Sequence, residues 1–209
     1  MLASLPPVTR AIILANVAVF LLQQVAPELL TGLFALWPLG SGYFQPWQLL
    51  SYAFLHEGVL LRLDVTHILF NMLAVFMFGG PLERFWGSRR FALYYLISVL
   101  SAAATELVVE NATGVGNPVV GASGGVFGLL LAFAWYFPRE PLIFVFFPVP
   151  LPAWLFVTLY GVMELVLGVT GAQANVAHFA HLGGMLGGAL AIIYWRVRRR
   201  FDHGRFPPA

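Results

Sequence analysis

Long apolar segments recur along the chain and are separated by shorter polar stretches. A bilayer core of about 30 Å requires roughly 20 mostly apolar helical residues per crossing. We therefore expect an all-α membrane protein with six transmembrane helices, forming a single membrane domain over residues 1–209. The first segment lacks a small-residue cleavage site followed by a polar mature domain, so we expect a retained span rather than a signal peptide. The expected spans are about 8–26, 66–82, 90–109, 121–137, 152–170 and 174–195.

The overall composition agrees with a bilayer as the solvent. Charged residues make up 10% of the chain, hydrophobic residues make up 60%, and the mean hydropathy is +0.84. A soluble domain needs far more polar surface, so soluble and disordered classes are excluded. The net charge of +2 is too small for a phosphate-binding surface, so we expect no nucleic-acid partner. Because the chain has no cysteine, disulfides and thiolate metal sites are excluded.

The arginines are distributed unevenly between the two sides of the membrane. With six spans and both ends on one side, only Arg62 lies opposite the other arginines. This asymmetry follows the positive-inside rule, so we expect both termini in the cytoplasm. The arginines on that side are Arg10, Arg84, Arg89, Arg90, Arg139, Arg196, Arg198, Arg199, Arg200 and Arg205.

The stretch from about residue 27 to residue 65 is too long for a simple hairpin, and prolines interrupt it. We expect a loop that lies at the outer interface and is partly embedded, although an ordinary loop anchored by aromatic residues is the alternative. The aromatic residues in question are Phe34, Trp37, Tyr43, Phe44 and Trp47.

Strongly polar side chains within spans are costly and therefore raise a functional question. Spans two, four and six all run from outside to inside. His67 and Asn71 open span two, Ser123 opens span four, and His178 and His181 lie one to two turns into span six. These side chains therefore share a depth near the outer face.

Ser123 lies in a glycine-rich string, from Gly121 to Gly128, at the expected start of a helix. The glycines free space around the hydroxyl, and helix N-terminal amides stabilise a developing oxyanion. The alternative is helix packing, because Gly124 and Gly128 form a small-xxx-small pair. Gly184 and Gly188 form a second such pair on the face of His181, which brings the imidazole within reach of Ser123.

The remaining histidines leave alternatives open. His67 and Asn71 project from one face of a helix, where they suit either an oxyanion site or a polar clasp between helices. We expect His178 to be a wet interfacial residue rather than a partner of the site, and His56 and Glu57 to face water.

His67, His178 and His181 together offer three nitrogen ligands for a metal ion. The motif His-Glu-x-x-His is absent, and no carboxylate shares their depth on the same helices. We therefore expect no metal and no cofactor. Glu106 and Glu164 suit either a hydrogen bond between helices or a lipid-gate element.

Together these strings resemble the rhomboid family of intramembrane serine proteases. The match covers spans two to six, and three motifs occur in the family's order on alternate helices. The flanking strings Trp47–Leu50, Phe54–His56 and Leu82–Ser88 look like bacterial members. The three motifs are His67-x-x-x-Asn71, Gly121-Ala122-Ser123-Gly124, and Ala180-His181-Leu182-Gly183-Gly184 followed by Gly188.

The resemblance implies a serine endopeptidase with a Ser-His dyad and no acidic third member. Ser123 matches the nucleophile and His181 the general base. His67, Asn71 and the Ser123 backbone N–H match the oxyanion hole, and Phe127 matches the aromatic position on which the imidazole packs. Residues 57–66 look longer and more polar than the family's usual linker.

The resemblance also implies where the protein acts and on what. We expect a bacterial cytoplasmic (inner) membrane and transmembrane protein substrates that enter beside span five and are cut near the outer face. A non-proteolytic, client-binding relative of the family is the alternative. A channel or transporter is a third hypothesis, because Glu106 and Glu164 are carboxylates within or at the edge of spans. The inverted repeats of many transporters are, however, not evident in the sequence.

Overall fold

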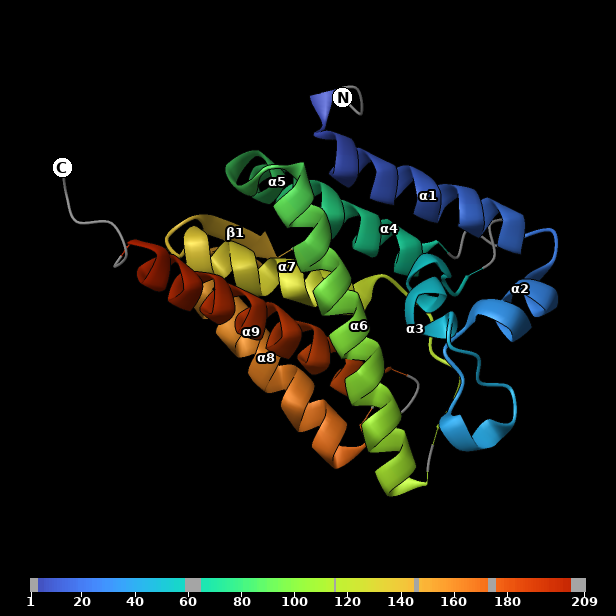
Figure 1. Ribbon diagram of the computed structural model, residues 1–209. Coiled ribbons are helices and arrows are strands. Elements are labelled where there is room, and N and C mark those ends of the chain that lie inside the picture. The colour runs from blue at the N-terminus through green and yellow to red at the C-terminus, as the bar shows by residue number, and fades with distance from the viewer. Residues whose placement is uncertain (1–3, 59–64, 115, 145–146, 173–175, 204–209) are drawn as a thin grey trace.

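The computed structural model describes residues 4–58, 65–114, 116–144, 147–172 and 176–203 and is mostly helical. Its helices pack side by side as a bundle, with α1 and α2 at one flank and α8 and α9 at the other (Figure 1). The α-helices are α1 (Pro7–Gln23), α2 (Pro27–Phe34), α3 (Gln48–Ser51), α4 (Thr66–Ala74), α5 (Gly80–Trp86), α6 (Ser88–Thr113), α7 (Ser123–Tyr136), α8 (Ala153–Thr170) and α9 (His178–His203).

Each of the six expected apolar segments contains a helix. The π-helical turn η5 (Val75–Gly79) joins α4 to α5, so residues Thr66–Trp86 form one continuous helical segment. Within the described residues, this segment, Ser88–Thr113 and Ala153–Thr170 are long and apolar enough to cross a membrane. Two other apolar helices, Pro7–Gln23 and Ser123–Tyr136, are shorter. The number of six crossings therefore stays a prediction.

Glycines set the close packing of α6, α7 and α9, which contact one another at the centre of the bundle. A Cβ atom on Gly184 of α9 would overlap the backbone of Gly124 on α7. One on Gly128 of α7 would overlap Ser98 of α6. Because these two glycines lie directly against the neighbouring helix, a larger residue at either position overlaps atoms of that helix.

A short β-hairpin joins α7 to α8, which the expectation of an all-α fold missed. Strands β1 (Pro141–Phe144) and β2 (Phe147–Pro152) pair antiparallel. Prolines at 148, 150 and 152 cannot donate ladder hydrogen bonds. Such a strand is compatible only with a sheet edge, and this sheet has two strands, both of them edges.

The segment between α1 and α4 contains α2, α3 and two 3₁₀ turns, η2 (Leu39–Ser41) and η3 (Tyr52–Phe54). The buried Gln48 holds this loop together, because its amide donates to the carbonyls of Leu33 and Tyr43 and accepts the N–H of Trp37. The loop is thus an ordered structure with its own polar core. Its embedding in the membrane interface stays a prediction, and most of the expected long linker 57–66 lies outside the described residues.

Glu83 ties the beginning of α1 to α5 and α6. Its carboxylate accepts hydrogen bonds from the backbone N–H groups of Val8 and Thr9, at 3.0 and 2.7 Å, and from the hydroxyls of Thr9 and Ser88. A carboxylate at a helix N-terminus satisfies free N–H groups and interacts favourably with the helix dipole. Sequence patterns gave no indication of this contact.

Candidate active site

Ser123 is the first residue of α7, and the chain enters this helix in an unusual conformation. Gly121 has a φ of +129°, which favours glycine, and its N–H donates to the carbonyl of Tyr52 at 3.0 Å. Two residues earlier, Val119 pairs with Leu36 through two backbone hydrogen bonds of 2.9 Å. The glycine-rich string therefore fixes the hydroxyl of Ser123 at a helix N-terminus.

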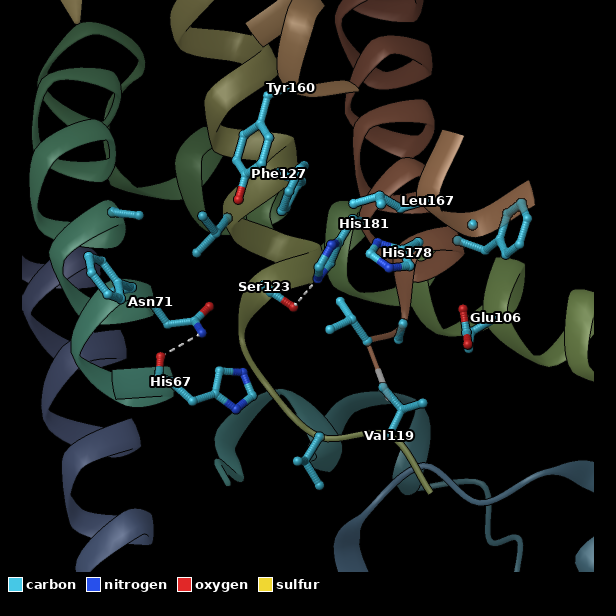
Figure 2. A pocket seen from close by; sticks show the side chains of 18 of the residues that line it. His67, Asn71, Glu106, Val119, Ser123, Phe127, Tyr160, Leu167, His178 and His181 are labelled. Carbon is cyan, nitrogen blue, oxygen red and sulfur yellow. Dashed lines mark hydrogen bonds between the residues drawn. The ribbon is translucent and has the colours of Figure 1, made fainter. Parts of the chain in front are cut away.

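His181 of α9 contacts the serine directly. Its Nε2 atom lies 2.8 Å from Oγ of Ser123 (Figure 2). Phe127, one turn into α7, stacks on the imidazole with ring centroids 4.3 Å apart and planes at 7°. The ring is therefore restrained on one face by an aromatic side chain and at one edge by the serine.

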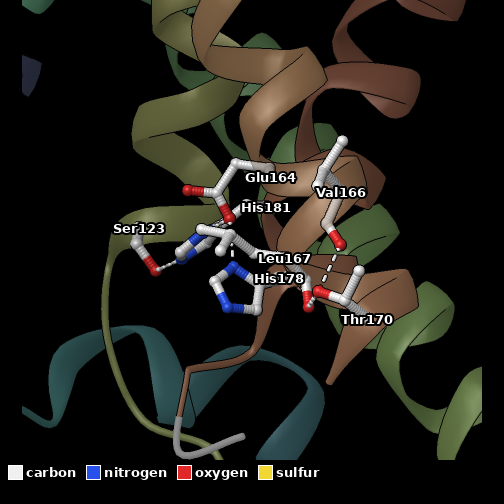
Figure 3. Close-up of polar contacts among 7 residues, drawn as sticks. All are labelled: Ser123, Glu164, Val166, Leu167, Thr170, His178 and His181. Carbon is white, nitrogen blue, oxygen red and sulfur yellow. Dashed lines mark hydrogen bonds and ion pairs between the residues drawn. The ribbon is translucent and has the colours of Figure 1, made fainter. Parts of the chain in front are cut away.

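Glu164 of α8 occupies the other edge of the same imidazole. Its Oε2 atom lies 2.9 Å from Nδ1 of His181 and 2.6 Å from Nδ1 of His178 (Figure 3). The expectation was that no carboxylate shares the depth of these histidines on their own helices; Glu164 reaches them from a different helix, α8. Glu164 lies in the C-terminal half of α8, six residues before its last residue, Thr170.

His178 is also placed differently from the expectation. Its side chain is 5% exposed and bonded to Glu164, so it is not a wet interfacial residue. The potential ligand atoms of Glu164, His178 and His181 lie within 4.8 Å of one another, whereas His67 is outside this group. Atoms that bind one zinc ion at about 2.0 Å in a tetrahedron lie roughly 3.3 Å apart. The observed contacts are shorter and match hydrogen bonds.

His67 and Asn71 lie at the beginning of α4 and point toward the serine side of the site (Figure 2). Nδ1 of His67 accepts the backbone N–H of Glu57 at 3.3 Å, so the ring proton is on Nε2. A Cβ atom on Gly121 would lie 2.8 Å from Nε2 of His67 and 3.6 Å from Oγ of Ser123. The missing side chain of Gly121 thus leaves a small space between these two groups.

One N–H of the Asn71 side-chain amide is engaged in a hydrogen bond within α4. Nδ2 donates to the carbonyl of His67 at 2.9 Å, and the side chain is buried. An amide nitrogen carries two hydrogens, so the second remains for another acceptor.

The sequence led us to expect His56 to face water, but its side chain is buried, with 2% of the residue exposed. Its ring packs edge-on against His67, with centroids 5.0 Å apart, and its backbone N–H donates to Oε1 of Gln23 at 2.9 Å. Within the described residues neither ring nitrogen has a hydrogen-bond partner. Burial, and to a smaller extent the charge of His67, lowers the pKa of His56 to about 3. The ring is therefore neutral, and it packs against its neighbours as an uncharged side chain. Glu57 is exposed.

A cavity of about 770 Å³ opens beside the serine. Its wall includes Ser123, His181, His67 and Asn71, and it extends between α4 and α8. Glu106 of α6 also lines it, and within the described residues its Oε2 atom is unpartnered. The site therefore combines a serine hydroxyl, a base in contact with it, N–H donors and room for a peptide segment.

Comparison with known proteins places most of the chain within one family model. The family model described as Rhomboid domain matches residues 43–198. The chain is 28% identical over 200 residues to Rhomboid protease GlpG of Serratia proteamaculans (strain 568), covering 93% of this chain and 64% of that protein. It is 29% identical over 145 residues to Rhomboid protease GluP of Bacillus subtilis (strain 168), covering 69% of this chain and 25% of that protein.

A eukaryotic relative has a similar degree of identity. RHOMBOID-like protein 12, mitochondrial, of Arabidopsis thaliana is 30% identical over 160 residues, covering 69% of this chain and 45% of that protein. The chain thus spans less than two thirds of the length of each of these three relatives.

Proposed function

Because the chain belongs to the rhomboid family, we propose that it is an intramembrane serine endopeptidase that cleaves transmembrane proteins near the outer face of the membrane. The observation that carries the proposal is the 2.8 Å contact between Oγ of Ser123 and Nε2 of His181 in the wall of a large cavity. A nucleophile within hydrogen-bond reach of a base is the arrangement that activates a serine. Relatives named as rhomboid proteases support this activity.

In the first step, His181 acts as the general base. Nε2 takes the hydroxyl proton of Ser123 while Oγ attacks the carbonyl carbon of the scissile peptide. The carbonyl oxygen becomes an oxyanion, which the Ser123 backbone N–H, Nε2–H of His67 and the second Nδ2–H of Asn71 stabilise. The space beside Gly121 lies between Nε2 of His67 and Oγ of Ser123.

In the second step, the protonated imidazole acts as an acid. It gives its proton to the leaving amine as the carbon–nitrogen bond breaks, which leaves an ester between Oγ and the acyl part of the substrate. A water molecule that loses a proton to Nε2 then attacks the ester. The second tetrahedral intermediate collapses, releases the carboxyl product and returns the proton to Ser123. The cavity provides room for this water.

The exposed apolar surface of α8 supports a transmembrane substrate. Leu159, Val162, Val166 and Val169 are each more than half exposed, although they are large and apolar. Such a face is stable against lipid or against an apolar substrate helix. Because the cavity extends between α4 and α8, a substrate that enters beside α8 reaches Ser123 without leaving the bilayer.

Cleavage near the outer face requires that the protein have a defined orientation in the membrane. We place both termini in the cytoplasm of a bacterial inner membrane, because the arginines gather on that side of a six-span topology. The absence of cysteine allows a direct test with single-cysteine variants. A membrane-impermeant maleimide should label Gly40→Cys in intact spheroplasts but Arg139→Cys only after permeabilisation. The reverse pattern would refute the orientation.

A serine-reactive fluorophosphonate tests the proposed chemistry without any assumption about the natural substrate. Purified protein should be labelled, Ser123→Ala should not be labelled, and His181→Ala should lose more than about 90% of the labelling rate because the hydroxyl then has no base. Equal labelling of wild type and Ser123→Ala would refute Ser123 as the nucleophile. A protein that only binds clients would show no labelling in any of the three forms.

A further inference from the structure

We propose that Glu164 is a positioning residue that converts the Ser123–His181 pair into a Ser-His-Glu arrangement. This inference rests on the proposed protease function and adds a third member to it. The carboxylate comes from α8, the imidazole from α9 and the hydroxyl from α7, and Figure 3 shows the three groups in line. The contacts at the two edges of the ring measure 2.9 and 2.8 Å.

The first consequence concerns the tautomer of His181. A deprotonated carboxylate only accepts hydrogen bonds, so Glu164 selects the form with a proton on Nδ1. The lone pair is then on Nε2, the atom that faces Oγ of Ser123. A dyad without this partner leaves both neutral tautomers accessible, and the form with Nε2–H cannot take the serine proton.

The second consequence concerns the charged state that forms during reaction. When Nε2 takes the serine proton, the ring becomes an imidazolium with Glu164 at 2.9 Å. The side chains of Glu164 and His181 are 4% and 11% exposed, so water screens this pair weakly. A carboxylate in this position stabilises the positive ring, and with it the oxyanion intermediate.

His178 has a different task from His181. Its ring is close to perpendicular to that of His181, at 89°, and its Nδ1 atom contacts the same carboxylate oxygen from another direction. A buried carboxylate is costly unless it is hydrogen-bonded, and His178 provides a second donor. His178 therefore holds Glu164, and Glu164 orients His181.

The competing interpretation is that Glu164 only fastens α8 to α9. That role predicts a loss of stability with no specific effect on the chemical step. Three variants of the full chain separate the two roles: Glu164→Gln removes the charge at nearly constant volume, Glu164→Asp keeps the charge, and His178→Leu removes the other partner. Glu28→Gln, on an exposed position of α2, is the control for loss of one carboxylate.

The kinetics of a fluorogenic transmembrane peptide provide the first readout. We expect Glu164→Gln to lower kcat about 10- to 100-fold with KM within about twofold of wild type, because the lost interaction acts on the chemical step. The kcat of Glu164→Asp should be at least about threefold higher than that of Glu164→Gln. His178→Leu should lower the melting temperature as much as Glu164→Gln and yet keep at least about fivefold higher kcat. Glu28→Gln should match wild type.

Other results would overturn the inference. If Glu164→Gln keeps the wild-type kcat, or if His178→Leu loses as much kcat as Glu164→Gln, Glu164 is a clasp between helices. If Ser123→Ala retains cleavage, the proposed function itself fails, whatever Glu164 does. If Ser123→Ala loses peptide cleavage while Glu164→Gln cleaves at the wild-type rate, only the role of Glu164 is refuted.

Nitrogen NMR of imidazole-labelled histidine gives a second readout, which a purely structural role would not move. In Ser123→Ala, which keeps the histidines, we expect the His181 signals of a neutral ring with its proton on Nδ1. Adding Glu164→Gln should shift these signals toward the other tautomer or a mixture. Unchanged His181 signals in a folded Glu164→Gln protein would contradict the proposal.

Discussion

The Oγ atom of Ser123 lies 2.8 Å from Nε2 of His181, although 58 residues separate them in the sequence. The two side chains lie on α7 and α9, whose backbones touch where Gly124 faces Gly184. A contact through backbone atoms allows little variation in the distance between helices. The helix contact thus determines the distance between nucleophile and base.

Replacing Gly121 should test the oxyanion site. In Gly121→Ala the new Cβ would lie 2.8 Å from Nε2 of His67, and the residue would have to keep a φ of +129°. We expect cleavage of a transmembrane peptide to fall about 100-fold or more, the usual effect of losing one oxyanion donor. Fluorophosphonate labelling should fall in parallel. Wild-type rates in this variant would place the oxyanion elsewhere.

Replacing Gly184 should separate the nucleophile from the base. In Gly184→Ala the methyl group would overlap the Gly124 backbone, which can yield only if α7 and α9 move apart. We expect a loss of about 1–3 kcal/mol in stability and a marked loss of cleavage, both measured in the same detergent. Gly32→Ala is the matched control, because nothing lies within 4 Å of its added Cβ and the residue is helical. Equal behaviour of the two variants would contradict the packing account.

Phe127 should act through its ring face rather than through its volume. The stack on His181, with centroids 4.3 Å apart, restrains the imidazole plane. Phe127→Leu keeps an apolar side chain but loses the stack, so we expect kcat to fall about tenfold, part of the usual contribution of a positioned base. Phe127→Tyr keeps the aromatic face and should stay within about threefold of wild type. Similar kcat values for the leucine variant and wild type would exclude a stacking role.

Much of the site could be predicted because the expected six-span topology makes spans two, four and six run in the same direction. Their first turns are then expected at one depth, and the structure has His67, Asn71, Ser123 and His181 in the wall of one cavity. The glycine pairs were also informative, because small residues spaced by four mark where helices can approach. Depth and spacing along a helix can be counted directly from a sequence.

Other features depend on information that such counting does not provide. In the expected topology span five runs in the opposite direction, and because α8 is apolar on most faces, its sequence does not tell which face packs against the bundle. The contact of Glu164 with His181 therefore appeared only in three dimensions. The burial of His56 and the hydrogen bonds of Glu83 likewise join segments whose relative placement the sequence pattern leaves open.

We propose that Ser123 and His181 together cleave a peptide bond within the membrane. The most direct measurement is cleavage of a fluorogenic transmembrane peptide by the purified full chain in lipid vesicles, compared with Ser123→Ala. Wild type should give a product cut near the outer end of the peptide. Cleavage by Ser123→Ala should be lower by at least about 1000-fold, because acyl transfer is lost with the nucleophile. Equal cleavage by the two proteins would contradict this proposal.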